Sequence, residues 1–455
     1  TGDRGPIFED IEELITTIST DSRAVSCTVS DDNPSGEAAG VSAVTLTYQL
    51  DSQTATVNSV SLSMTAGTAE DGTWEGDIPG QASGTTVYWS LTATDGNGNS
   101  TSSATFSYFI FQPTAEATLL FNNQDVLYGN MLYIPYVYFY WGWSEGYDIW
   151  DQSYGNLTEE VVSNYDVIIE LANNPTYNAD NVISNWWGPT KTYIVAGDEW
   201  LGARYGWSGT TTIPDGDVAR EILGIETYYP DINGSSSAIS RLNPISGDDV
   251  VDPLYDFVDS VGGVLNYDPQ YDPGHSNWLD GVDAVDGYHV AMTGYSGALD
   301  SADAVPIGEE VYNVMIYRIY NGKTAFLAFD PISLYVATND NDHQYWVGAH
   351  DYSGFNVSPL VLAYEWLETT ETDYAAYASA GEDQEVEVGS VVTLSGIASV
   401  GDQYLWTQLS GTEVILSSDT TSIVSFTAPS VAGLLSFQLT ASDSLMPNFY
   451  RTDTT

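Results

Sequence analysis

Three carboxylates are the residues of this sequence best suited to chemistry. Asp198 and Glu199 directly follow the apolar run 191–197, and Asp330 directly follows a second apolar run, 324–329. Paired carboxylates can act as general acid and base, or they can hold a hard cation such as Ca²⁺. Because the chain holds 63 Asp and Glu residues, three of them can also lie close together without a function. A catalytic site and a solvated or Ca²⁺-occupied cluster therefore both remain open.

Short loops rich in Asp and Asn form a second group of candidates, as ligands for Ca²⁺. Oxygen ligands, with glycines that permit tight turns, suit this ion, although no loop has the spacing of an EF-hand. The alternative is that these loops are simply solvated. The candidate ligands are Asp31, Asp32, Asp95, Asn97, Asp340 and Asp342.

Cysteine and histidine offer little further chemistry. The one cysteine, Cys27, lies in the alternating run 24–29, which predicts a buried strand residue rather than a reactive thiol. The histidines lack ligand spacing of the HExxH kind and are expected at the surface or in the core. They are His275, His289, His343 and His350.

Aromatic residues are dense between positions 133 and 147. A single helical stripe cannot turn all of them inward, so some are expected to be exposed in a protein interface. Buried packing and a sugar-binding platform are the alternatives. The residues of this candidate interface are Tyr133, Tyr136, Tyr138, Tyr140, Trp141 and Trp143.

The charge balance excludes several classes of partner. Against 9 Lys and Arg stand 63 Asp and Glu, so the formal net charge is −54 and nothing could neutralise nucleic-acid phosphates or anionic membranes. The longest uncharged apolar stretch, 131–143, contains Pro135 and is too short to span a bilayer. A start at Thr1 suits a processed, secreted protein, which predicts an extracellular or cell-surface location. The length of 455 residues predicts about three domains.

The first region, residues 15–112, reads as short strands between turns, and residues 1–14 are expected to be an N-terminal extension outside it. The segments 41–50 and 86–94 alternate between apolar and polar residues, and 95–99 is a strong turn. This pattern predicts a β-sandwich. The region resembles the Ig-like (fibronectin III-like) modules of secreted bacterial proteins at residues 29–33, 44–48 and 72–74.

The middle region, residues 113–370, changes its pattern. Near-continuous apolar runs alternate with candidate helices, which predicts an α/β domain with an open, mostly parallel sheet. A hairpin is expected where 311–319 and 324–329 flank Asn321-Gly322. The apolar runs are 118–123, 147–150, 165–171 and 191–197, and the candidate helices are 157–164, 179–187, 217–223, 253–261 and 358–367.

This middle region resembles the class I glutamine-amidotransferase-like (flavodoxin-like) domain, at residues 122–123, 147–151, 164–169 and 195–198. The resemblance implies a thiol nucleophile on the turn after a central strand and an activating histidine. At those positions the chain has Gly197-Asp198-Glu199-Trp200 and Phe329-Asp330-Pro331. The resemblance therefore implies a relative without the Cys/His pair, with three carboxylates at the strand ends where open α/β sheets bind ligands.

The last region, residues 371–455, returns to alternating strands. It resembles the PKD-like (polycystic-kidney-disease-type) Ig-like module, a β-sandwich, in its segments 380–386, 388–396, 404–408 and 435–443. The loop 399–403 is shorter than the acidic loop of that family. The final strand is expected to begin near Arg451, which leaves open an incomplete end of the module.

Together these features predict a non-enzymatic extracellular structural or adhesive protein, such as a component of a filament, sheath or surface layer. Its copies are expected to self-associate in a medium rich in divalent cations, which offset the repulsion between acidic chains. Extracellular glycans are a further candidate partner. The alternative is a secreted hydrolase, or a glycan-binding protein, with its site in the middle region.

Overall fold

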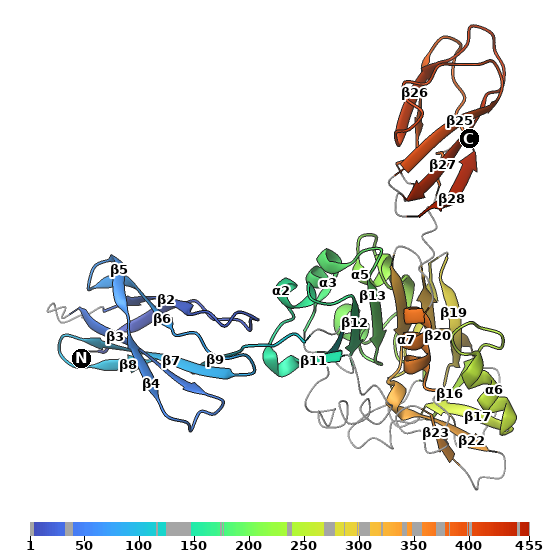
Figure 1. Cartoon of the computed structure of the whole chain (residues 1–455). Helices are drawn as coiled ribbons and strands as arrows, with labels where there is room; N and C mark the ends of the chain where they lie inside the picture. Colours follow the sequence, from blue (N-terminus) through green and yellow to red (C-terminus); the bar gives the residue numbers. More distant parts are fainter. Residues whose placement is uncertain are drawn as a thin grey trace. The chain divides into compact units, whose positions relative to one another are not determined.

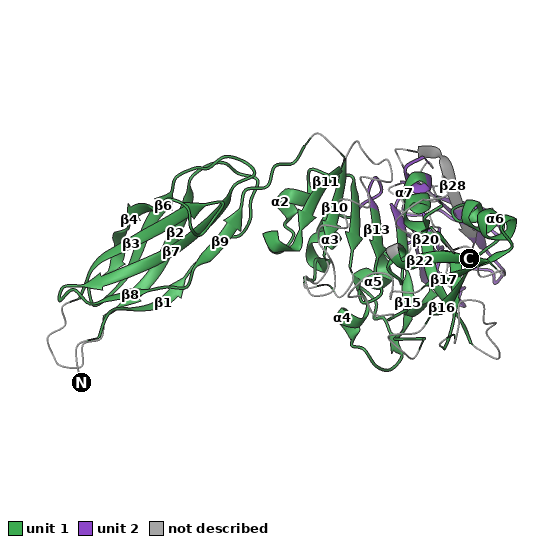
Figure 2. Ribbon diagram, turned by 90° about the horizontal axis from the view of Figure 1, so that it is seen from below, with its two compact units in different colours: residues 1–187, 193–317, 325–365 green, residues 188–192, 318–324, 366–455 purple. Residues whose placement is uncertain are grey.

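A computed structural model gives the fold of the chain, which consists mainly of strands (Figure 1). Its contacts divide it into two units (Figure 2): residues 1–187, 193–317 and 325–365, and residues 188–192, 318–324 and 366–455. The structure describes residues 4–31, 40–114, 117–123, 147–172, 175, 177–233, 239–267, 278–285, 287–297, 299, 310–319, 322–338, 344–347, 357–369, 378–381, 383–397, 399, 403–443 and 446–454.

Two sheets near the N-terminus share one apolar core. Strict alternation drives this packing, because every second residue of β7 (Thr86–Asp95) is buried. Cys27 lies in that core, where burial raises the pKa of its thiol to about 11, so it is the buried strand residue that the sequence predicts. The first sheet has the order β1 (Ile7–Ile11), β2 (Arg23–Ser30), β6 (Asp71–Ile78), β5 (Ser63–Gly67); the second contains β4 (Asn58–Ser61), β3 (Val41–Leu50), β7, β8 (Ser100–Ser102) and β9 (Phe106–Phe109).

The N-terminal residues differ from their prediction as an extension outside the sandwich. Strand β1 pairs antiparallel with β2, from Ile7 opposite Ser30 to Ile11 opposite Cys27. Most of its side chains are exposed, and only Phe8 and Ile11 pack against the core. So short and polar a strand carries no hydrophobic alternation that would reveal it in the sequence.

A mixed sheet of fourteen strands forms the middle of the chain. Strands β10, β12 and β13 are buried at every residue, as their continuous apolar runs predict. The main order of the sheet is β11 (Tyr147–Asp151), β10 (Thr118–Asn122), β12 (Val167–Leu171), β13 (Thr192–Ala196), β21 (Lys323–Leu327), β20 (Val311–Arg318), β19 (His289–Tyr295), β16 (Ser240–Pro244), β17 (Gly263–Tyr267), β22 (Leu334–Thr338) and β23 (Gln344–Trp346). Beside this path lie β14 (Thr211–Thr212), β15 (Ile225–Tyr229) and β18 (Gly281–Ala284).

The prediction of a mostly parallel sheet is wrong for this sheet. Strand β10 pairs in parallel with β11 and β12, but the pairs that join β16, β17, β19, β20, β22 and β23 are antiparallel. A continuous apolar run indicates burial on both faces and does not give the direction of a strand. The links decide the direction: β23 begins six residues after β22 ends, and a parallel crossover needs about a dozen residues or more.

All five predicted helices are present, and each begins within two residues of its predicted start. The side chain of Thr158 caps α2 and that of Asp217 caps α5. Figure 1 shows α2, α3 and α5 beside strands β12 and β13, and their apolar residues join the same core cluster. Strands β20 and β21 are neighbours on either side of the predicted hairpin turn. The helices are α2 (Glu159–Val162), α3 (Asp180–Trp186), α4 (Gly202–Tyr205), α5 (Val218–Glu221), α6 (Asp252–Ser260) and α7 (Pro359–Thr369), with 3-10 turns η1 (Gln152–Tyr154) and η3 (Pro331–Ser333).

The C-terminal region has two small sheets around a core that contains Trp406. The last strand begins at Met446 rather than near Arg451 and pairs along β27, so the sheet holds the strand that the sequence places later. The sheets are β24 (Val391–Ser395) with β26 (Ile423–Thr427), and β25 (Gln403–Ser410), β27 (Ser436–Asp443) and β28 (Met446–Thr454).

Candidate functional site

Asp198 and Asp330 lie together at one edge of the middle sheet. They follow the neighbouring strands β13 and β21, and the N–H of Gly197 donates to the carbonyl of Leu327 at 3.1 Å. The hydroxyl of Tyr267 donates to Asp198 Oδ2 at 2.9 Å and accepts the backbone N–H of Asp330 at 3.3 Å. Both carboxylates are buried. The structure thus brings together two of the three predicted carboxylates through a tyrosine that the sequence did not single out.

Glu199, the third predicted carboxylate, has a different partner. The indole N–H of Trp207 donates to Glu199 Oε2 at 2.6 Å. Gly202 permits this approach, because a Cβ at that position would lie 2.6 Å from Trp207 Cδ1. Burial raises the pKa of Glu199 to about 8, and the carboxylates of Asp198 and Asp231 add to the effect. Glu199 therefore keeps its proton at neutral pH.

Two further carboxyl groups complete the cluster. Asp280 is buried and accepts the backbone N–H of Asp231 at 3.1 Å. Burial raises the pKa of Asp280 well above its ordinary value, and the nearby Glu199, Asp231 and Asp198 raise it further. The sequence shows Asp280 only as a member of an Asp-rich loop, and Asp231 has no local signal at all. We call Asp198, Glu199, Asp231, Asp280 and Asp330 the carboxylate cluster.

The carboxylate cluster is better suited to holding protons than to holding a cation. Its members are bonded to separate partners: Tyr267 for Asp198, Trp207 for Glu199 and the Asp231 backbone for Asp280. Across the described residues, no group of three or more His, Cys, Asp or Glu side chains is arranged to hold a metal ion. Buried carboxyls that lack a cation lower their repulsion by taking up protons. A protonated carboxyl beside an ionised one is also the arrangement of an acid–base pair.

The predicted calcium ligands are only partly described. Asp95 is buried in its turn and accepts hydrogen bonds from Asn97 N at 2.9 Å, Asn99 N at 2.8 Å and Asn99 Nδ2 at 2.9 Å. These bonds give the Asp95 carboxylate a structural role in the turn. Asp31 is buried, with its backbone N–H on the carbonyl of Glu70. Outside the described residues lie Asp32, Asp340 and Asp342, the aromatic candidates Tyr133, Tyr136, Tyr138, Tyr140, Trp141 and Trp143, and the histidines His275, His343 and His350.

A second buried charge network lies at the ends of β12 and β13, and the sequence analysis missed it. Glu170 accepts from Asn123 Nδ2 at 2.8 Å and from the hydroxyl of Tyr193. Burial raises the pKa of Glu170, while the nearby Arg204 lowers it. Arg204 pairs with Asp180 at 2.9 Å and stacks 3.5 Å from the ring centroid of Trp200. The only signal in the sequence is a lone Glu within an otherwise apolar strand.

The comparisons with known proteins identify one part of the chain. Residues 380–448 match a family model that is described as a PKD domain, so this part is a PKD-like domain. No curated protein matches the chain. Within the described residues, no helix combines the length and the apolar character needed to cross a bilayer.

Similar solved structures share only small parts with this chain. A cycloalternan-forming enzyme from Listeria monocytogenes is 10% identical over 21% of this chain and 8% of its own, with a TM-score of 0.18. The BhCBM56 structure is 18% identical over 24% of this chain and 99% of its own, with a TM-score of 0.16. The purple acid phosphatase PPD1 from yellow lupin is 8% identical over 43% and 35%, with a TM-score of 0.17. At these TM-scores the likenesses say nothing about fold or function.

Proposed function

We propose that this chain is a non-enzymatic extracellular protein with a structural or adhesive role. One observation carries the proposal: large apolar side chains are exposed mainly on the PKD-like domain. Among the described residues, 17 large apolar side chains are exposed, and 10 of them lie between Val386 and Leu434. Soluble surfaces rarely gather so many, and such patches mark sites of protein contact.

The charge and the domain type support the same proposal. PKD-like domains are typical of extracellular proteins, and one is matched here at 380–448. A net charge of −54 makes copies repel one another, so contacts between them depend on screening by the medium. In this proposal divalent cations outside the cell offset that repulsion and allow self-association.

Sedimentation velocity of the full chain tests this proposal. With millimolar Ca²⁺ we expect the mass to rise with protein concentration, and with a chelator we expect it to rise less. The variant Leu405→Ser/Leu409→Ser should weaken association, because both side chains are exposed on β25. The matched control Val57→Ser/Met64→Ser removes two exposed apolar side chains from the first region and should leave association unchanged. A monomer at every concentration in both media would contradict self-association.

A second candidate function is a hydrolase with Asp198, Glu199 and Asp330 as its carboxylates. The observation that favours it is the pKa of Glu199, about 8, which leaves a proton available for a leaving group near neutral pH. Glycoside and peptide substrates should then be cleaved by the native chain and not by Glu199→Gln. If the structural or adhesive proposal is right, no cleavage will depend on Glu199.

A further inference from the structure

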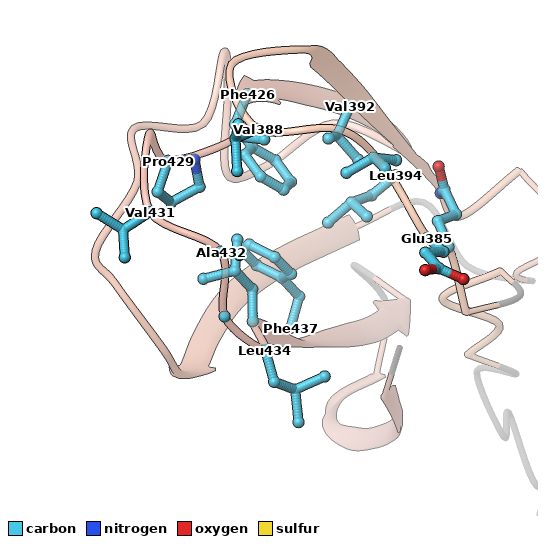
Figure 3. A pocket seen from close by; sticks show the side chains of 15 residues that line it. Glu385, Val388, Val392, Leu394, Phe426, Pro429, Val431, Ala432, Leu434 and Phe437 are labelled. Atoms are coloured by element: carbon cyan, nitrogen blue, oxygen red, sulfur yellow. The ribbon is translucent and has the colours of Figure 1, made fainter.

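The PKD-like domain contains an apolar pocket that opens onto its core (Figure 3). The pocket encloses about 400 Å³, within the range of about 300–1,000 Å³ that is typical of ligand sites. Its floor consists of core side chains from β24, β26 and β27: Val392, Leu394, Phe426 and Phe437, which are all buried. Figure 3 shows Phe426 and Phe437 on opposite sides of the same space. A side chain that enters the pocket would therefore contact the core of the domain.

The rim of this pocket is exposed and apolar. Four of its branched aliphatic residues face solvent, from Val386 at 46% and Val388 at 54% to Val431 at 73% and Leu434 at 85%. Two separate segments supply them: residues 386 and 388 precede β24, and residues 431 and 434 link β26 to β27. We call these four residues the pocket rim. Covering the rim would remove apolar surface from water, which favours an occupant with apolar side chains.

Carboxylates lie beside this apolar surface, and cations are missing from it. Glu385 lines the pocket and is seen at one end of it in Figure 3, while Asp383 and Glu387 are exposed in the same segment. From residue 378 to 443 the sequence has no Lys, Arg or His. Nothing in this stretch neutralises these carboxylates, so they favour a positively charged occupant.

We infer that the pocket binds a protein segment in which Lys or Arg alternates with large apolar residues. An apolar side chain of the segment enters the pocket and contacts the rim, and the flanking cations face Glu385 and its acidic neighbours. A second copy of this chain fits poorly, because only 9 of its 455 residues are Lys or Arg. This inference deepens the adhesive role proposed above and rests on it.

A labelled peptide of the sequence KIKFKIK, added to the full chain, tests the inference by fluorescence anisotropy. We expect saturable binding that weakens several-fold when NaCl rises from 50 to 500 mM, since screening reduces the attraction between exposed charges. The variant Val431→Ser/Leu434→Ser should bind roughly tenfold more weakly, because it removes the most exposed apolar part of the rim. The matched control Ile397→Ser/Ile415→Ser changes two side chains that are 73% and 91% exposed and do not line the pocket, and it should bind normally.

Two further peptides separate the apolar and the charged parts of the recognition. EIEFEIE should not bind, because its carboxylates meet those beside the pocket. KSKSKSK should bind much more weakly than KIKFKIK, because it has no side chain that fills the pocket. Equal binding of KIKFKIK and KSKSKSK, or equal binding by the rim and control variants, would overturn the inference.

Sedimentation velocity of the native chain and the rim variant distinguishes this inference from self-association. If the native chain dimerises and Val431→Ser/Leu434→Ser abolishes the dimer, the occupant is a second copy and the inference is wrong. Failure to bind the peptide alongside normal self-association would reject this inference and leave the proposed function standing.

Discussion

At the scale of single residues, the adjacent carboxyls Asp198 and Glu199 have separate surroundings. Asp198 accepts a hydrogen bond from the hydroxyl of Tyr267, while Glu199 accepts one from the indole of Trp207. In its buried position Glu199 has a pKa of about 8, against an ordinary value of 4.5. Since the folded state thus holds a proton that the unfolded chain releases at lower pH, Glu199 links stability to pH.

We expect the middle region to lose stability as pH rises from about 4.5 to 8. In this window the folded state binds more protons than the unfolded state, so the free energy of unfolding falls by up to about 1.4 kcal/mol per pH unit for this group. Glu199→Gln is neutral throughout and keeps an acceptor for Trp207, so it should flatten the decline. Calorimetric melting at pH 5, 6, 7 and 8 measures this. The exposed Glu413→Gln is the control, and parallel pH profiles of native chain and Glu199→Gln would contradict the prediction.

Arg204 offers a second prediction at this scale. Its side chain is 5% exposed and pairs with Asp180, and its charge offsets that of buried Glu170. Arg204→Met should lower the free energy of unfolding by about 3–5 kcal/mol, because it leaves buried carboxylates without their cation. Arg220→Met is the control, since its partner Asp215 is 93% exposed and the loss should be about 0–1 kcal/mol. Urea denaturation compares the two, and equal losses would show that the buried pair has no special role.

At the scale of elements, local signals were predictable and long-range ones were not. Helix α5 was predictable because Asp217 is a capping residue before an apolar stretch, and the β20–β21 hairpin because Asn-Gly favours a tight turn. Asp198 and Asp330 could be placed at strand ends, since each directly follows an apolar run. Asp231 and Asp280 are 49 residues apart and meet only through the tertiary fold. No spacing in the sequence encodes such a contact.

Strand β1 carries the prediction at this scale. Deleting residues 1–11 should lower the melting temperature of the first region by several degrees, because β2 loses its antiparallel partner and the core loses the cover of Phe8 and Ile11. Calorimetry of the full chain and the truncated chain measures this, with the transitions of the other regions as internal controls. An unchanged transition for the first region would mean that β1 contributes no stability.

At the scale of the whole molecule, charge dominates. With 63 acidic and 9 basic residues, self-repulsion opposes compaction unless ions screen it. The carboxylate cluster adds buried charge only to the extent that its protons are lost. Stability should therefore depend on the ionic medium as well as on pH.

We expect the melting temperature in chelator to rise when NaCl increases from 20 to 300 mM. Replacing part of the NaCl by millimolar Ca²⁺ at constant ionic strength should raise it further if the Asp-rich loops bind the ion. Mg²⁺ at the same ionic strength is the control, because its stricter octahedral geometry suits these loops less well. Identical midpoints in Na⁺, Mg²⁺ and Ca²⁺ would mean that screening alone acts and that the loops hold no calcium.

The scarcity of cations also bears on proteolysis. Proteases of the trypsin type cleave after Lys or Arg, and two of the nine such residues here, Arg204 and Arg241, are buried. Residues 324–450 contain neither residue type, so a single uncut tract includes nearly all of the PKD-like domain. Such enzymes would find few accessible bonds in the folded chain and would leave the pocket rim on one fragment.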